Sequence, residues 1–159
     1  MEEKIDTYTV SFFGHRYIEN PLEIEKLLEK IISELLDQQH FIEFLIGNDG
    51  DFDRIATSAI RRCRRRLGTY NSSLTLVLPY ATSDYTNNVN YYHESYDDIE
   101  ICAHSSSAHF KTAHKIRNQE MIDRSNMVVF YVQNNKGGAF TAMQYAKKKG
   151  IDYINLCEK

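Results

Sequence analysis

The chain has 159 residues, of which 42% are hydrophobic and 26% charged, and its formal net charge is -3. These values predict one soluble globular domain over residues 1–159, without the overall positive field that attracts nucleic acid or anionic membranes. No apolar run reaches the roughly 20 residues of a membrane span, and the amino terminus lacks a signal-peptide pattern. The three widely spaced cysteines favour reduced thiols and a cytoplasmic location.

The first predicted elements are a strand, a helix and a second strand. β-Branched and aromatic residues over 7–13 predict a buried strand, which a glycine ends. Pro21 opens a helix that we expect to reach about residue 39, because leucine and isoleucine recur at helical spacing. The apolar residues 41–46 predict the second strand, and again a glycine follows.

The middle of the chain is less regular. Residues 52–67 predict a second helix and residues 74–78 a third strand. The stretch 84–96 is polar and rich in asparagine and tyrosine, so we expect a long loop or lid there. Residues 97–101 predict a short strand.

The last third of the chain returns to a regular alternation of elements. We expect a helix over 108–124, a continuously apolar strand over 127–132, a helix over 139–149 and a final strand over 153–156. Alternating strands and helices predict the α/β class, as a Rossmann-like three-layer α/β/α sandwich with a mostly parallel sheet.

Glycines and polar residues follow three of these strands. Gly14-His15-Arg16, residues 47–51 and Gly137-Gly138 all lie at the carboxyl ends of strands, where such sheets bind ligands. In the first segment, the glycine allows close backbone approach, the histidine can donate to a phosphate or ribose oxygen, and the arginine can hold a phosphate. The later glycine pair precedes a helix and can expose its amide groups to an anion.

Carboxylates add to this predicted site. Asp49 and Asp51 can accept ribose hydroxyls, and Asp123 can do the same or act as a base. The structural alternatives are that residues 14–16 form only a solvated turn and that Asp51 is first of all a helix N-cap.

Other polar clusters point less clearly to chemistry. His104, His109 and His114 lack a companion carboxylate at metal-ligand spacing, so we expect no metal and no cofactor. The basic run 61–66 is predicted to be the solvated face of a helix, with a contact to RNA or to a second subunit as the alternative. The ordinary dinucleotide and P-loop glycine patterns are absent.

Four segments in order resemble the SLOG superfamily, the Rossmann-like group of DprA/Smf proteins and LOG phosphoribohydrolases, and in particular its small stand-alone bacterial or phage members. These segments are Gly14-His15-Arg16, GNDGDFD at residues 47–53, RNQEMID at 117–123 and GGAFT at 137–141. The resemblance covers nearly the whole chain and implies a single SLOG-like domain.

The resemblance also implies which residues serve the site. LOG enzymes cleave the N-glycosidic bond of nucleoside monophosphates with an arginine and a glutamate. Arg117 and Thr141 match the two LOG segments, but the glutamate position falls on Gln144, a neutral side chain that cannot stabilise positive charge on the ribose. If the chain turns over a substrate, the catalytic candidates are Asp51, Arg117 and Asp123.

Three functions remain open from the sequence. The first is a module that binds a nucleotide or an NAD- or ADP-ribose-derived molecule, as a sensor or a sequestering protein. The alternatives are a nucleotide N-glycosidase, and DprA-like nucleic-acid binding through the basic run 61–66. We expect a nucleotide-like ligand and at least a homodimer, and neither a nucleic-acid nor a membrane partner. The residues expected to bind the ligand are Gly14, His15, Arg16, Gly47, Asn48, Asp49, Asp51, Arg117, Asn118, Gly137, Gly138, Ala139, Thr141 and Gln144.

Overall fold

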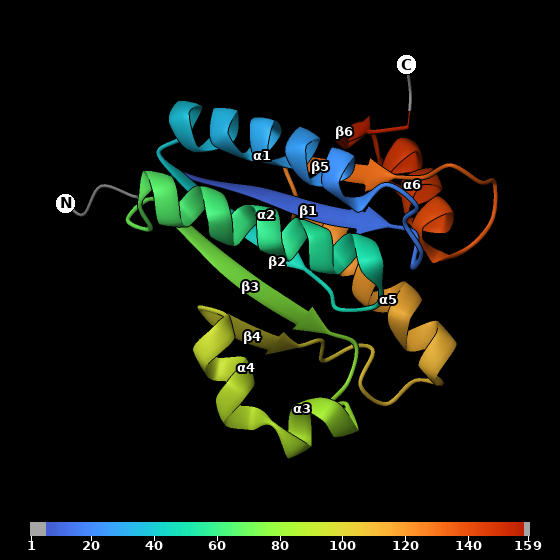
Figure 1. Cartoon of the computed structure of the whole chain (residues 1–159). Helices are drawn as coiled ribbons and strands as arrows, with labels where there is room; N and C mark the ends of the chain where they lie inside the picture. The colour runs from blue at the N-terminus through green and yellow to red at the C-terminus, as the bar shows by residue number, and fades with distance from the viewer. Residues whose placement is uncertain (1–5, 158–159) are drawn as a thin grey trace.

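A computed structural model describes residues 6–157 (Figure 1). Its elements are β1 (Thr7–Gly14), α1 (Pro21–Gln38), β2 (Phe41–Ile46), α2 (Asp51–Leu67), β3 (Ser72–Leu78), α3 (Ser83–Asn87), α4 (Val89–Ser95), β4 (Asp98–Ile101), α5 (Phe110–Asp123), β5 (Met127–Tyr131), α6 (Gly138–Lys149) and β6 (Asp152–Asn155). No helix within these residues is both long and apolar enough to span a bilayer.

The strands form one six-stranded sheet in the order β4-β3-β2-β1-β5-β6. Every pair is parallel, which confirms the predicted Rossmann-like α/β class. The chain runs outward from β1 to β4 and then returns to place β5 on the other side of β1. Gly14 at the end of β1 is the register partner of Tyr131 at the end of β5. The loops after these strands therefore begin side by side, at the switch point where such sheets bind ligands.

Helices cover both faces of the sheet (Figure 1). Successive side chains of a strand point to opposite faces, so Phe12 belongs to the core under α1 and α2, while Phe13 belongs to the core under α5 and α6. The same alternation recurs in β2, where Phe44 and Leu45 belong to different cores. Because both faces are covered, the inner strand β5 is continuously apolar, whereas the edge strands β4 and β6 carry charged and polar side chains.

Residues 84–96 are not the loop or lid that their composition predicted, because α3 and α4 occupy most of this stretch. The Thr82 hydroxyl caps α3 by accepting the Tyr85 N–H at 3.1 Å. Tyr92 is only 5% exposed and packs edge-on against Tyr85, with ring centroids 5.5 Å apart, and parallel to Tyr96, at 6.3 Å. Tyrosine rings supply the apolar face here, so the helices lack the leucine and isoleucine pattern that predicts a helix from sequence.

The end of β1 lies against the first turn of α2. A Cβ on Gly14 would stand 2.2 Å from Cγ of Phe52, which is fully buried. We therefore expect Gly14→Ala to lower the free energy of unfolding by about 1–3 kcal/mol through overpacking. Urea denaturation measures this, with Gly138→Ala as control because a Cβ there meets no atom within 4 Å. Equal stabilities of the two variants would contradict the packing role of Gly14.

Candidate functional site

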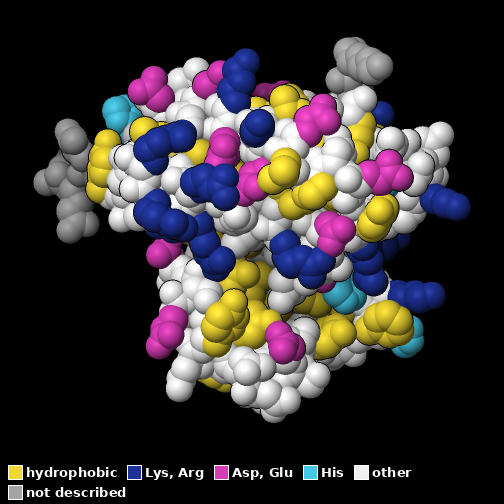
Figure 2. All heavy atoms as spheres, viewed as in Figure 1, with side chains coloured by type: hydrophobic (Ala, Val, Ile, Leu, Met, Phe, Trp, Pro, Cys, Tyr) yellow, Lys and Arg dark blue, Asp and Glu magenta, His cyan; other side chains and the backbone are white. Residues whose placement is uncertain are grey.

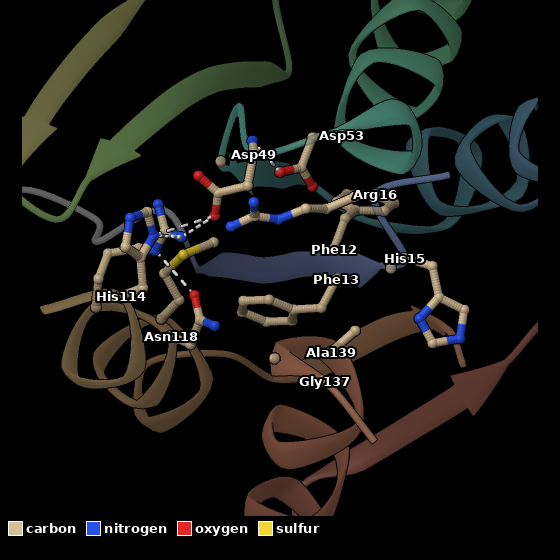
Figure 3. A pocket seen from close by; sticks show the side chains of 15 residues that line it. Phe12, Phe13, His15, Arg16, Asp49, Asp53, His114, Asn118, Gly137 and Ala139 are labelled. Atoms are coloured by element: carbon tan, nitrogen blue, oxygen red, sulfur yellow. Dashed lines mark hydrogen bonds and ion pairs between the residues drawn. The ribbon is translucent and has the colours of Figure 1, made fainter. Parts of the chain in front are cut away.

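An inner pocket of about 230 Å³ opens at the carboxyl end of the sheet, between the ends of β1 and β2 and helices α5 and α6 (Figure 3). The fold thus brings together residues from all four predicted segments. The predicted residues that line it are Gly14, His15, Arg16, Gly47, Asp49, Arg117, Asn118, Gly137, Gly138 and Ala139.

An outer hollow of about 540 Å³ adjoins the inner pocket and shares Arg16, His114 and Gly138 with it. It continues between α5 and α6, and Thr141 is the predicted site residue that lines only this part. We call the inner pocket and the outer hollow together the edge groove.

The remaining predicted residues lie elsewhere. Asn48 lines a separate cleft beside α2. Asp51, Asp123 and Gln144 line neither part of the edge groove. Arg117 is thus the one catalytic candidate in the inner pocket, and the position of the LOG glutamate lies outside it.

Asp51 and Asp123 make contacts within the chain that hold them away from the edge groove. Asp51 accepts the Ile18 N–H at 3.1 Å and pairs with Arg54, so it fastens the β1–α1 loop to α2. Asp123 accepts the Tyr145 hydroxyl at 2.7 Å, which links α5 to α6.

Arg117 is engaged inside the protein and is only 1% exposed. Its Nη1 donates to the Val77 carbonyl at 2.9 Å, and its Nε donates to Oδ1 of Asn118 at 2.8 Å. Its Nη2 forms an ion pair with Asp49. The arginine therefore ties α5 to the end of β3 and to the β2–α2 loop, and these contacts leave little of it for a ligand phosphate.

The two carboxyl groups of the inner pocket are in different states. Burial alone would raise the pKa of Asp49, but the hydrogen bond from His114 and the charge of Arg117 hold that pKa well below its ordinary value. Asp53 accepts the Asp49 N–H at 2.8 Å, and burial together with the Asp49 charge raises the pKa of Asp53 to about 7. The Asp49 charge is balanced by Arg117, and Asp53 carries a proton below neutral pH.

Asp53 lines the inner pocket, and the sequence offers it as a substitute for the missing LOG glutamate but not as one of the predicted ligand-binding residues. It closes the GNDGDFD segment, and it is buried on the apolar face of α2 with Phe52 and Ala56. A carboxylate at a core position of an amphipathic helix is the signal that could have identified it.

His15 holds the loop between β5 and α6. Its Nε2 accepts the N–H groups of Gln133 and Asn134, at 2.7 and 3.3 Å, which requires a ring nitrogen without a proton. Burial lowers the pKa of His15, in agreement with a neutral ring. Figure 3 shows the ring pointing away from the Asp49 carboxylate, so His15 shapes the inner pocket through its loop.

Free hydrogen-bond donors face the inner pocket from two sides. Gly137 has φ 98, a conformation that favours glycine, and no side chain caps the N-terminus of α6 behind it. The first amides of a helix have no partner within the helix, and a Cβ on Gly137 or Gly138 would meet open space. From the loop after β1, the exposed side chain of Arg16 extends along the opposite side of the pocket toward Asp49 and Asp53 (Figure 3). A helix N-terminus facing a guanidinium forms an anion site.

The outer hollow adds cations and an aromatic surface that the sequence prediction did not single out. Lys111 and Lys115 line it from α5, together with Phe110, whose side chain is 53% exposed. Lys111 and Lys115 are four residues apart and so lie on one face of α5, and Phe110 and His114 line the same hollow. This spacing of basic and aromatic residues is the sequence signal that could have identified the outer hollow.

Most arginines of the basic run 61–66 serve the fold. Arg62 lies 3.4 and 3.3 Å from carboxylate oxygens of Glu25 and Glu29 on α1. Arg64 pairs with Asp97 at 2.7 Å, and Arg66 donates to the Ser33 hydroxyl at 2.9 Å. These arginines fasten α2 to its neighbours, so the run as a whole is not a free nucleic-acid surface.

No protein-family model and no curated protein sequence matches this chain, but solved structures do. DNA processing protein A (DprA) of Streptococcus pneumoniae superposes with a TM-score of 0.67 at 14% identity, over 92% of this chain and 49% of that one. DprA of Helicobacter pylori, in a structure that describes its single-stranded DNA binding mode, also superposes with a TM-score of 0.67 at 14% identity. This match covers 96% of this chain and 66% of that one. The chain thus spans half to two thirds of these proteins, and it has their Rossmann-like fold, as the SLOG resemblance implied.

This comparison corrects one expectation from the sequence, namely that nucleic acid is not a partner. Helicobacter pylori DprA, which shares this fold, has a single-stranded DNA binding mode. The expectation rested on the net charge of -3, which averages over the whole surface. It therefore missed the cations Arg16, Lys111 and Lys115, which the fold gathers along one groove.

Proposed function

We propose that the edge groove binds single-stranded nucleic acid, with a backbone phosphate held between Arg16 and the N-terminus of α6. The observation that carries this proposal is the uncapped helix N-terminus at Gly137-Gly138 facing an exposed arginine across the inner pocket. Charge favours an anion there, because Asp49 is paired with Arg117, whereas Arg16 forms no ion pair with any residue that the structure describes.

The shape of the edge groove favours a strand over a compact ligand. The inner pocket, at about 230 Å³, is smaller than the roughly 300–1,000 Å³ of ordinary small-molecule sites. It accommodates a phosphate and part of a sugar, and the next residues of a strand continue into the outer hollow. There Lys111 and Lys115 can meet further phosphates, and the exposed ring of Phe110 can stack on a base.

Arg16→Ala tests this proposal. We expect it to weaken binding of a fluorescent oligothymidylate about tenfold, and to reduce the slope of log affinity against log salt by about 0.7, the value for one phosphate contact in a single strand. Fluorescence anisotropy at several salt concentrations measures both quantities. Lys148→Ala is the matched control, because Lys148 is an exposed cation of α6 outside both parts of the groove. Equal losses in the two variants would show that only overall charge matters.

A free nucleotide or NAD-derived molecule is the second candidate ligand. The observation that favours it is the continuity of the inner pocket with the larger outer hollow, so that a phosphate in the first places a base in the second. Calorimetry with nucleoside monophosphates, ADP-ribose and NAD tests this candidate. Tight binding of one of them, with displacement of the oligonucleotide, would favour the small ligand, and no heat from any would remove it.

A further inference from the structure

A second groove lies on the other side of the β2–α2 loop, between α2 and the α3–α4 segment. Its cavity measures about 430 Å³, and we call it the arginine–tyrosine cleft after Arg54, Arg61, Arg65, Tyr91 and Tyr96, which line it. Figure 2 shows dark blue side chains at the level of α2 above a hollow with a yellow floor, closed on its far side by the α3–α4 segment. Cations on one wall and tyrosine rings on the other match an alternating chain of phosphates and bases.

We propose that the arginine–tyrosine cleft binds a second segment of the strand held in the edge groove. This inference rests on the proposed function and extends it to a longer footprint, with phosphates on the α2 wall and a base on the tyrosine wall.

The arginines of α2 divide into two sets by helical position. Arg54, Arg61 and Arg65 are separated by seven and four residues, so they lie along one face of the helix, toward the cleft. Arg64 and Arg66 face other elements, and they have the fold contacts described above. Arg62 also lines the cleft, but its guanidinium lies against Glu25 and Glu29 of α1.

Arg61 is held in place between the two walls. Its Nη2 donates to the Ser95 carbonyl at 2.6 Å, and its guanidinium lies 5.0 Å from the ring centroid of Tyr96. These contacts leave other N–H groups of Arg61 for a phosphate. Arg65 is exposed, with no hydrogen bond or ion pair to any residue in the part of the chain that the structure describes. Arg54 shares its charge with Asp51.

Tyr91 supplies the stacking surface. Its side chain is 65% exposed. The ring packs edge-on against Tyr92, with ring centroids 5.7 Å apart. Tyr92 is itself buried, and its hydroxyl donates a hydrogen bond to Asp84. A rigid, supported aromatic ring on the surface is the arrangement on which nucleic-acid bases stack.

The two grooves share a wall. Gly47 and Asp53 line both the inner pocket and the arginine–tyrosine cleft, so only the β2–α2 loop separates them. Asn48, at the tip of this loop, is exposed and lies on the cleft side. A strand with a phosphate at Arg16 can therefore cross this loop into the cleft without leaving the protein surface.

Strand length separates this inference from the proposed function. We expect an oligonucleotide of about 4 nucleotides to occupy the edge groove alone and one of about 16 to reach the cleft as well. Tyr91→Ala should weaken binding of the long strand about tenfold. Arg65→Ala should weaken it about fivefold and lower the slope of log affinity against log salt by about 0.7. Binding of the short strand should stay unchanged in both variants.

The matched controls are Tyr70→Ala and Lys148→Ala, which change exposed residues outside both grooves. Oligothymidylate and oligouridylate arms distinguish DNA from RNA.

Ultraviolet crosslinking adds a readout that does not depend on affinity. The long strand should crosslink to the peptide that contains Tyr91, and the short strand should not. If wild type binds neither strand, the proposed function and this inference both fail. If it binds both equally, or if Tyr91→Ala binds the long strand as wild type does, the inference alone is overturned and the edge groove remains the binding site.

Discussion

Replacing Arg117 by methionine is expected to lower the free energy of unfolding by about 3–5 kcal/mol, the usual cost of removing one partner of a buried ion pair. The substitution keeps an apolar stem of similar length but leaves Asp49 without its cation and the Val77 carbonyl without a donor. It also frees the side chain of Asn118. Urea denaturation followed by circular dichroism gives the change.

Two further variants make this prediction specific. Lys115→Met removes a cation from the exposed face of the same helix and should change stability by less than about 0.5 kcal/mol. Combining Arg117→Met with Asp49→Asn should restore part of the lost stability, because the unpaired charge is then gone. A loss for Arg117→Met no larger than that for Lys115→Met would contradict the buried network.

The second large effect concerns the buried carboxyl group of Asp53. Its pKa is about 7 in the folded chain against 3.8 unfolded, so the folded state binds this proton more tightly. The stability that this group contributes is therefore full below about pH 4 and is lost as the pH rises through about 7. In Asp53→Asn the side chain stays neutral at every pH, and its amide oxygen can still accept the Asp49 N–H. The variant should therefore be more stable than wild type at pH 8, by on the order of 4 kcal/mol at most.

Asp51→Asn is the contrasting control. Asp51 lies two residues earlier on α2, and the Ile18 N–H and the contact with Arg54 lower its pKa. Its contribution to stability is therefore present at neutral pH and is lost as the pH falls. Asp51→Asn should destabilise near neutral pH, whereas Asp53→Asn should stabilise. A stability profile of Asp53→Asn parallel to wild type from pH 4 to pH 8 would contradict the raised pKa.

The fold was predictable because its signals are local. Residues 7–13 are rich in β-branched and aromatic side chains and residues 127–132 are continuously apolar, as expected for strands in a sheet covered on both faces. Gly14 ends β1 and Gly137 caps α6 in the segment after β5, but only the strand order of the structure makes β1 and β5 neighbours. The loop expected over 84–96 was the error, because tyrosine rings rather than aliphatic side chains bury the face of α4.

The chemistry of the site was less predictable, because the sequence does not show which residues from distant segments pair with one another. Arg117 lines the inner pocket, but its partners Val77 and Asp49 come from distant segments and occupy its donors. Asp51 and Asp53 look equivalent in sequence, but the helix turns one toward the loop at Ile18 and the other into the core. The net charge likewise gave no indication that Arg16, Lys111 and Lys115 lie together in the edge groove.

The central claim is that a strand phosphate binds at the N-terminus of α6 opposite Arg16. Nuclear magnetic resonance of the isotope-labelled chain during titration with a short oligothymidylate tests it most directly. We predict saturable shifts that are largest for the backbone amides of Gly138 and Ala139 and for the Nε–H of Arg16, because these donors face the proposed phosphate. Shifts confined to other surfaces, or none at low salt, would contradict the claim.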